Sequence, residues 1–176
     1  MFKFEKVSRF KNEDFNLPTR ATAESAGYDF IVAEDIILEP YYLIRNRLRN
    51  VPVNEPLSLE EVAKITKAEQ AKPALVSTGV KCTMPSNYYL QLSVRSSCPL
   101  KNWLIMANGV GVIDADYYNN PDNEGEIFFQ IINLSPFHIH LKKGDRIGQG
   151  IFLPYHITDD DNATEKRNGG FGSTSK

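Results

Sequence analysis

The stretch YYLQLSV, residues 88–94, is rich in aromatic and β-branched side chains, a composition typical of β-strands. Runs of the same kind recur along the chain, and turn-forming residues separate them. The other predicted strands are Tyr28–Val32, Ile36–Leu38, Leu75–Lys81, Ile127–Asn133, His138–Leu141 and Ile147–Phe152. Many short strands at this spacing predict an all-β fold: an antiparallel sandwich, a jelly roll or a distorted barrel.

Length and composition indicate a single domain, residues 1–176, whose core needs neither disulfides nor metals. Of the 176 residues, 41% are apolar and 24% are charged. A net charge of -2 and a pI near 5.9 provide no basic surplus for direct nucleic-acid binding. Any ligand related to nucleic acid is therefore expected to be small, such as a mononucleotide.

Cysteine usage and the absence of a targeting pattern predict a cytoplasmic protein. Cys82 and Cys98 lack the spacing of metal ligands and are expected to be reduced thiols. The N-terminal residues mix charges and aromatics too finely for a signal peptide. The longest apolar runs fall well short of the ~20 residues that cross a bilayer, so no membrane segment is expected.

Residues 58–71, SLEEVAKITKAEQA, interrupt the strand pattern with helical periodicity. Ser58 and Glu61 have the spacing of a capping box, which predicts a helix start. Prolines on both sides delimit residues 45–73 as a helical insertion between two strands. The insertion is either a plain surface addition or a docking element or lid for a protein partner.

The C-terminal residues 158–176 are polar and are expected to form a flexible tail. Within it, RNGGFGSTSK offers Arg167, glycine backbone amides, and the hydroxyls of Ser173 and Thr174, a composition suited to cradling phosphate. Phe171 lies between glycines and has little core to join. The tail therefore either closes over a ligand or is an ordinary frayed terminus.

Two other short motifs carry polar groups suited to phosphate oxygens. Arg95, Ser96 and Ser97 follow the strand 88–94 and offer a guanidinium and two hydroxyls. In KGDRIGQG, Gln149 projects a neutral amide from a strand. Each motif alone fits an ordinary surface loop or turn equally well.

Carboxylates stand at two further places where a site is expected. Asp114 follows the apolar pair Val112 and Ile113 in VGVIDADYY, where it could take a proton from water. Tyr117 could then lay its ring against a sugar or a base. Asp29, in AGYDF, cannot hold a metal alone, but a cation already bound to a triphosphate needs few protein contacts, often through water.

Taken together, AGYDF, RSSCPLKNWLIMANGVGVIDADYY, KGDRIGQGI and RNGGFGST resemble, in order and largely in spacing, the five motifs of the trimeric dUTP pyrophosphatases (dUTPases). The resemblance spans nearly the whole chain. It implies a distorted jelly-roll or β-barrel fold, Mg²⁺ as cofactor, and hydrolysis of dUTP to dUMP and pyrophosphate. It also implies a homotrimer in which motifs from three chains build each site.

The resemblance further implies a role for each matching residue. Asp114 would be the general base that activates the attacking water, and Arg95 would support the site. Asp29 would hold a metal-bound water, Tyr117 would lie under the deoxyribose, and Phe171 would stack over uracil. The remaining positions are Ser96, Ser97, Gln149, Arg167, Gly172, Ser173 and Thr174 for the phosphates, and Asn108, Gly111, Val112 and Ile113 for uracil.

The chain departs from the family pattern in three places. Residues 118–124 lengthen the turn between Tyr117 and the Gly-Glu pair at 125–126. The spacing from Arg167 to Phe171 is one residue shorter than in the commonest form, which leaves the phosphate partner of Arg167 open. The helix expected at 58–71 has no counterpart in the core pattern.

There are two alternatives, a related enzyme and a protein of another functional class. A dCTP deaminase would share the fold, the trimer and the Arg-Ser-Ser element, but it needs a catalytic glutamate where this chain has Gln130. A regulatory protein-binding module would use the insertion at 45–73 and could coexist with catalysis.

Overall fold

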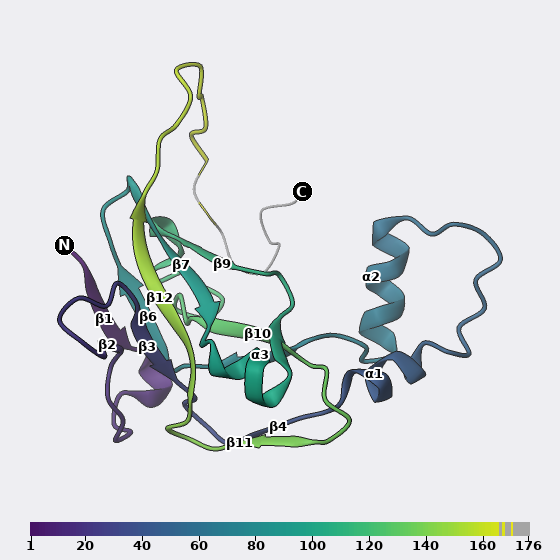
Figure 1. Ribbon diagram of the computed structural model, residues 1–176. Helices are drawn as coiled ribbons and strands as arrows, with labels where there is room; N and C mark the ends of the chain where they lie inside the picture. The colour runs from purple at the N-terminus through teal and green to yellow at the C-terminus, as the bar shows by residue number, and fades with distance from the viewer. Residues whose placement is uncertain (166, 168–169, 171–176) are drawn as a thin grey trace.

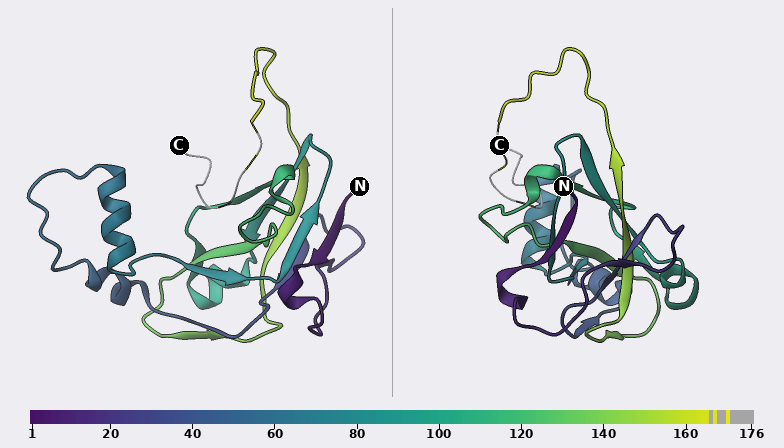
Figure 2. Two further views of the ribbon diagram at one scale, coloured as in Figure 1. Left: turned by 180° about the vertical axis from the view of Figure 1, so that it is seen from behind. Right: turned by 90° about the vertical axis from the view of Figure 1, so that its left-hand side faces the viewer.

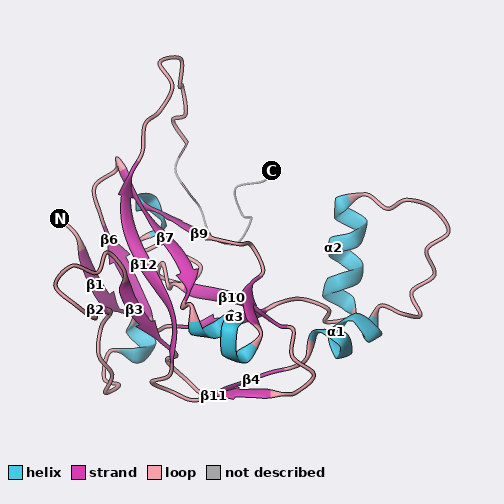
Figure 3. Cartoon of the chain, viewed as in Figure 1, coloured by secondary structure: helices cyan, strands magenta, loops and turns pink. Residues whose placement is uncertain are grey.

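The computed structural model describes residues 1–165, 167 and 170, and it is built mostly of strands (Figure 3). The strands are β1 Lys3–Lys6, β2 Thr19–Arg20, β3 Tyr28–Ile31, β4 Ile36–Leu38, β5 Ala74–Ser77, β6 Val80–Thr83, β7 Tyr88–Val94, β8 Leu104–Met106, β9 Gly111–Asp114, β10 Phe128–Asn133, β11 Ile139–Leu141 and β12 Arg146–Pro154. The helices are α1 Tyr41–Arg47, α2 Leu59–Ala68 and α3 Ser97–Asn102, with 3-10 turns η1 Ser8–Phe10 and η2 Ala115–Tyr117.

The strands form antiparallel sheets that enclose one main core (Figure 1). The largest sheet has the order β2-β3-β12-β7-β9, and a second sheet has the order β5-β10-β8. Phe30 of β3 and Phe129 of β10 meet in the core with ring centroids 5.8 Å apart. A Cβ at Gly148 would lie 2.0 Å from the Phe129 ring, so glycine lets β12 approach the core closely. This arrangement confirms the all-β, jelly-roll prediction.

Most predicted strands are confirmed, and one is wrong in its extent. The run Leu75–Lys81 was expected as one strand, but it divides into β5 and β6. Gly79 has φ +65 at the break, a conformation that glycine adopts without strain, and the chain passes there from one sheet to another. The short strands β1, β2 and β8 were not predicted.

The helical insertion is confirmed in type but not in its bounds. Ser58 caps α2 in a complete capping box with Glu61, as expected. The helix ends at Ala68, three residues before the predicted end, because Gln70 adopts φ +52. The insertion also begins earlier than residue 45, since α1 starts at Tyr41. Both helices project from the sheets in Figure 1 and in the left view of Figure 2.

Two further findings concern the cysteines and the helices. Cys82 and Cys98 are buried free thiols, as expected. Within residues 1–165, 167 and 170, none of the helices is long and apolar enough to cross a membrane.

Candidate active site

Asp114 stands at the end of strand β9, beside the start of β7. The pairing of these strands places Asp114 opposite Tyr89 and Gly111 opposite Leu92. Asp114 is also the N-terminal flanking residue of the turn η2, which carries Tyr117. Residues 108–117, which we call the hairpin, include both β9 and η2. The strand and the turn together position the backbone of the hairpin, the carboxylate of Asp114 and the ring of Tyr117 relative to one another.

A cleft of about 150 Å³ opens between this hairpin and strand β10. Its lining includes the predicted residues Asn108, Gly111, Val112, Ile113, Asp114, Tyr117 and Arg167. Ligand pockets usually measure roughly 300–1,000 Å³, so this cleft is small for a nucleoside triphosphate. One chain therefore supplies only part of a pocket for such a ligand.

Arg167 reaches back to the acidic end of the hairpin. Its guanidinium forms a close ion pair with Asp114 and a second, at 2.9 Å, with Asp116. Burial raises the pKa of Asp114, the charge of Asp116 also raises it, and Arg167 lowers it. Arg167 was expected at a phosphate, and in this structure the two carboxylates hold it.

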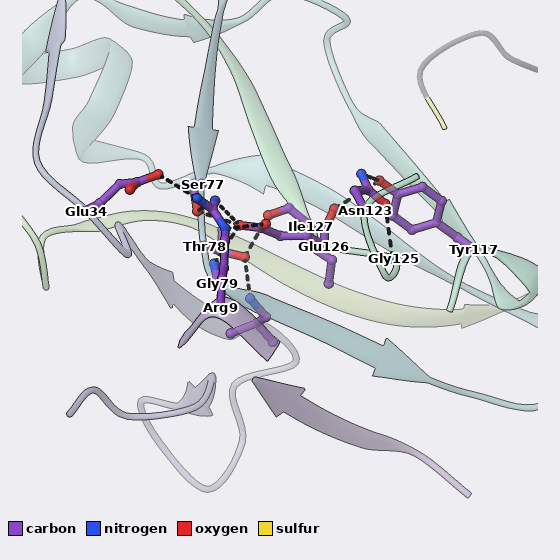
Figure 4. A network of polar contacts seen from close by, with 11 residues as sticks. Arg9, Glu34, Ser77, Thr78, Gly79, Tyr117, Asn123, Gly125, Glu126 and Ile127 are labelled. Carbon is purple, nitrogen blue, oxygen red and sulfur yellow. Dashed lines mark hydrogen bonds and ion pairs between the residues drawn. The ribbon is translucent and has the colours of Figure 1, made fainter. Parts of the chain in front are cut away.

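Tyr117 is almost fully buried and its hydroxyl faces away from solvent. The hydroxyl donates to the backbone carbonyl of Glu126 at 2.9 Å and accepts from Nδ2 of Asn123 at 2.7 Å (Figure 4). Burial raises the pKa of Tyr117, so the hydroxyl keeps its proton at neutral pH. Gly170 approaches the ring so closely that a Cβ there would lie 2.9 Å from it.

A second group of predicted residues gathers where β3, β7 and β12 lie side by side. Gln149 pairs in register with both Asp29 and Ser93. Arg95 follows the end of β7 and lies 3.5 Å from Asp29, while Arg146 lies 3.4 Å from the other carboxylate oxygen. Ser96 and Ser97 open helix α3 directly after Arg95.

These two groups lie far apart in one chain. Asp114 is opposite Tyr89, and Arg95 lies six residues further along the same direction of β7. At about 3.3 Å per residue, roughly 20 Å of strand separates them. The chain alone therefore does not bring the carboxylate of Asp114 to the group around Arg95.

Other residues in the cleft were missed as site residues by the sequence reasoning. Phe128 and Gln130 line it from β10, and Leu92 lines it from β7. The alternation of side chains along a strand would have placed Phe128 and Gln130 on one face. Asp116 was also missed, although it lies two residues from Asp114. The predicted Phe171, Gly172, Ser173 and Thr174 lie outside the described residues.

The protein offers few groups for a metal ion. Among residues 1–165, 167 and 170, no cluster of three His, Cys, Asp or Glu side chains could hold one. Asp29 is a single carboxylate with a guanidinium near each oxygen. Such a donor fits a contact through water to a cation that a polyphosphate already carries, and it does not fit direct ligation by the protein.

Comparisons with known proteins agree with this arrangement. The dUTPase family model matches residues 57–175. A deoxyuridine 5'-triphosphate nucleotidohydrolase of Lactococcus lactis subsp. lactis is 38% identical over 97% of this chain and 95% of its own length. The crystal structure of a dUTPase from Streptococcus mutans is 36% identical, with a TM-score of 0.68 over 89% of this chain and 98% of that one.

A mutant dUTPase from phage phi11 of S. aureus, which coordinates a structural Mg(II) ion, shares the fold. It has a TM-score of 0.61 and 18% identity, over 94% of this chain and 97% of that one. The family model and the relative from Lactococcus lactis cover the region that holds the cleft and Asp114. This chain belongs to the dUTPase family.

Proposed function

We propose that this protein hydrolyses dUTP to dUMP and pyrophosphate. The observation that carries the proposal is the half-buried Asp114 at the mouth of a cleft formed by the Gly111–Ile113 backbone and the Tyr117 ring, in a chain of the dUTPase family. The reaction would limit uracil incorporation into DNA and supply dUMP for thymidylate synthesis. Because it acts on the free nucleotide pool, we place it in the cytoplasm.

Asp114 acts on the attacking water in this proposal. Its carboxylate orients a water molecule and accepts a proton as the water oxygen bonds to the α-phosphorus. The bond from the α-phosphorus to the bridging oxygen breaks, and pyrophosphate leaves. Arg167 now occupies the carboxylate, so it must move toward the phosphates before the water can take its place.

The group around Arg95 binds the phosphate chain. Arg95, Ser96, Ser97 and Gln149 offer a cation, two hydroxyls and an amide to oxygens that gain charge as pyrophosphate departs. Bound Mg²⁺ neutralises phosphate charge and makes the phosphorus easier to attack. Asp29 would hold that ion only through water, in keeping with its single carboxylate.

The hairpin supplies selectivity for the nucleoside. Asn108 and the backbone of Gly111, Val112 and Ile113 read the polar edge of uracil, where cytosine has the opposite donor and acceptor pattern. Tyr117 lies under the deoxyribose and excludes a 2′-hydroxyl. In the tail, Phe171 stacks over uracil, and Gly172, Ser173 and Thr174 approach the outer phosphates.

We infer that the active unit is a homotrimer. The separation of roughly 20 Å between Asp114 and Arg95 in one chain, and the small volume of the cleft, support sites shared between subunits. In the shared site the hairpin of one subunit faces the phosphate-binding group of another, and the tail comes from a third. Light scattering on the purified protein tests the assembly, and an active monomer would contradict it.

The deaminase alternative is less well supported. Gln130 lines the cleft, but its neutral amide cannot shuttle the protons that deamination of dCTP requires. All of the relatives described above are dUTPases.

The decisive experiment measures pyrophosphate release from dUTP, dCTP, dTTP and UTP, with and without Mg²⁺. We expect rapid release from dUTP with Mg²⁺ and little from the other three nucleotides. A uracil product from dCTP would favour the deaminase. An assembled trimer that leaves dUTP intact with Mg²⁺ present would overturn the proposal.

A protein-binding role for the insertion is a second candidate, and one observation favours it. Helix α2 exposes apolar side chains, with Leu59 90% exposed and Val62 41% exposed. Replacing both with serine tests this role. Loss of a bound partner with full dUTP hydrolysis would support it, whereas loss of hydrolysis would assign the insertion to the enzyme itself.

A further inference from the structure

The lengthened turn after Tyr117 is a feature that the proposed function does not use. Residues 118–124 make this turn longer than in the family pattern, and hydrogen bonds within the turn order it. Asn123 of the turn and Glu126 just after it form hydrogen bonds with the Tyr117 hydroxyl (Figure 4). The question is whether this turn only closes the chain or also fixes the ring.

The Tyr117 hydroxyl is held from two sides. It donates to the carbonyl of Glu126 at 2.9 Å and accepts from Nδ2 of Asn123 at 2.7 Å. A phenol can donate one hydrogen bond, and here the backbone carbonyl of Glu126 accepts it. The side-chain amide of Asn123 donates a second hydrogen bond to the phenol oxygen. Asn123 belongs to the turn, and Glu126 lies between the turn and strand β10. The ring cannot withdraw from this position without breaking buried hydrogen bonds.

Asn123 is itself locked in place by its neighbours. Its Oδ1 accepts from Nδ2 of Asn120 at 2.7 Å and from the backbone N–H of Gly125 at 3.0 Å. Asn120 is buried and also donates to the carbonyl of Tyr117 at 3.0 Å. Gly125 has φ +80, and a Cβ there would lie 2.5 Å from the Tyr117 carbonyl oxygen. Only glycine closes the turn this tightly.

The other anchor, Glu126, is fixed by its side chain. The carboxylate is buried and receives Nε and Nη2 of Arg9 at 3.1 and 3.0 Å. It also accepts from the Ser77 hydroxyl and from the N–H of Gly79. Figure 4 shows these contacts converging on Glu126 from the N-terminal segment and from residues 77–79. The carbonyl that receives Tyr117 is therefore part of a rigid junction between the N-terminal segment, β5 and β10.

We propose that Asn123 and Glu126 are positioning residues that hold the Tyr117 ring in place and thereby set the discrimination between dUTP and UTP. The inference rests on the proposed function. An apolar pocket whose side chains can move rejects an added hydroxyl group poorly. Such pockets discriminate between substrates that differ by one small group by only about 10–200-fold. A ring tied at its hydroxyl cannot yield, so it keeps the space for a 2′-hydroxyl closed.

Asn123→Ala and Tyr117→Phe test the proposal from the two ends of one hydrogen bond. The first removes the amide, and the second removes the hydroxyl but keeps the ring and leaves the turn's own bonds with Asn120 and Gly125. Asn87→Ala is the matched control, because Asn87 is an exposed residue in the turn that precedes β7. For each variant, kcat and KM are measured with dUTP and with UTP.

We expect the ratio of kcat/KM for dUTP over UTP to fall about tenfold in each of the two variants, through a gain with UTP. In Asn123→Ala the kcat for dUTP should change little, since neither Asp114 nor a residue that contacts the nucleotide is altered. The double variant should fall no further than Tyr117→Phe, because that change already removes the bond between Tyr117 and Asn123. Asn87→Ala should keep the wild-type ratio.

Two results distinguish this inference from the proposed function. If the wild-type trimer leaves dUTP intact, the proposed function fails and the inference fails with it. If the wild type hydrolyses dUTP but folded Tyr117→Phe keeps the wild-type ratio, the inference alone is overturned. A lower kcat for dUTP with an unchanged ratio would likewise assign the turn a structural role only.

Discussion

The turn at residues 118–124, which Gly125 and Glu126 close, and the insertion at residues 41–73 both depart from the dUTPase pattern, but they are attached to the core in different ways. The turn buries Asn120 and Glu126 and ties the Tyr117 hydroxyl into a hydrogen-bonded network. The insertion is linked to the body at the surface, where Arg47 binds Glu39 and the Gln70 carbonyl. An added segment can therefore become part of a site or remain an appendage. Buried hydrogen bonds between the segment and the core distinguish the first case from the second.

The largest effect is expected from Asp114→Asn, in the hairpin that leads into the turn. The amide cannot accept the proton from water, so turnover of dUTP should fall by ~10² or more while nucleotide binding survives. Steady-state kcat and a separate binding titration measure the two quantities. Asp122→Asn, an exposed acid in the turn, serves as the control. Unchanged turnover in Asp114→Asn would remove this residue from its role.

The next largest effect is expected on the free energy of unfolding, when one ion pair from each region is removed. Glu126 is 4% exposed and Arg9 is 48% exposed, whereas Lys64 and Glu60 on α2 are both more than 70% exposed. Arg9→Met leaves a buried carboxylate without its cation and should lower the free energy of unfolding by about 2 kcal/mol, less than for a fully buried pair because solvent screens Arg9.

Lys64→Met supplies the matched change in the insertion and should alter stability by less than ~0.5 kcal/mol. Urea denaturation at one fixed protein concentration measures both variants, because assembly contributes to stability. Equal losses of unfolding free energy in the two variants would contradict the distinction between a turn that is bonded to the core and an insertion that is linked only at the surface.

Much of the fold followed from local patterns. The strand at 88–94 and the capping box at Ser58 were predicted correctly, because alternating or periodic apolar residues report local structure directly. The division of 75–81 into two strands was missed, since it depends on Gly79 turning the chain between sheets. Helix α1 was also missed, because its N-cap residue Pro40 supplies no capping side chain.

The candidate site was predictable in membership but not in arrangement. Motif spacing pointed to Asp114 and Tyr117, and both line one cleft. The pairing of Arg167 with Asp114 and Asp116 could not be predicted, because it joins segments about 50 residues apart in sequence. Asn123 carried no motif signal, since its role depends on the geometry of a turn that the family pattern lacks.

A smaller effect is expected on the pH dependence of hydrolysis. Burial and the charge of Asp116 both raise the pKa of Asp114, so activity should be lost as pH falls through this raised value. In Asp116→Asn one of the raising influences is gone, and the acidic limb of kcat/KM for dUTP should move to lower pH. Asp122→Asn should leave the limb in place. A limb that moves to higher pH would contradict this electrostatic account.

The smallest effect is expected in the insertion, from Ser58→Ala. The change removes the hydroxyl of the capping box and should cost helix α2 about 1 kcal/mol. Because every residue of α2 is at least partly exposed, that loss should stay local. Hydrogen exchange should speed up across residues 59–68 while the melting temperature and dUTP turnover stay at wild-type values. A fall in melting temperature as large as that of Arg9→Met would mean that the insertion is coupled to the core after all, and the contrast between the two regions would fail.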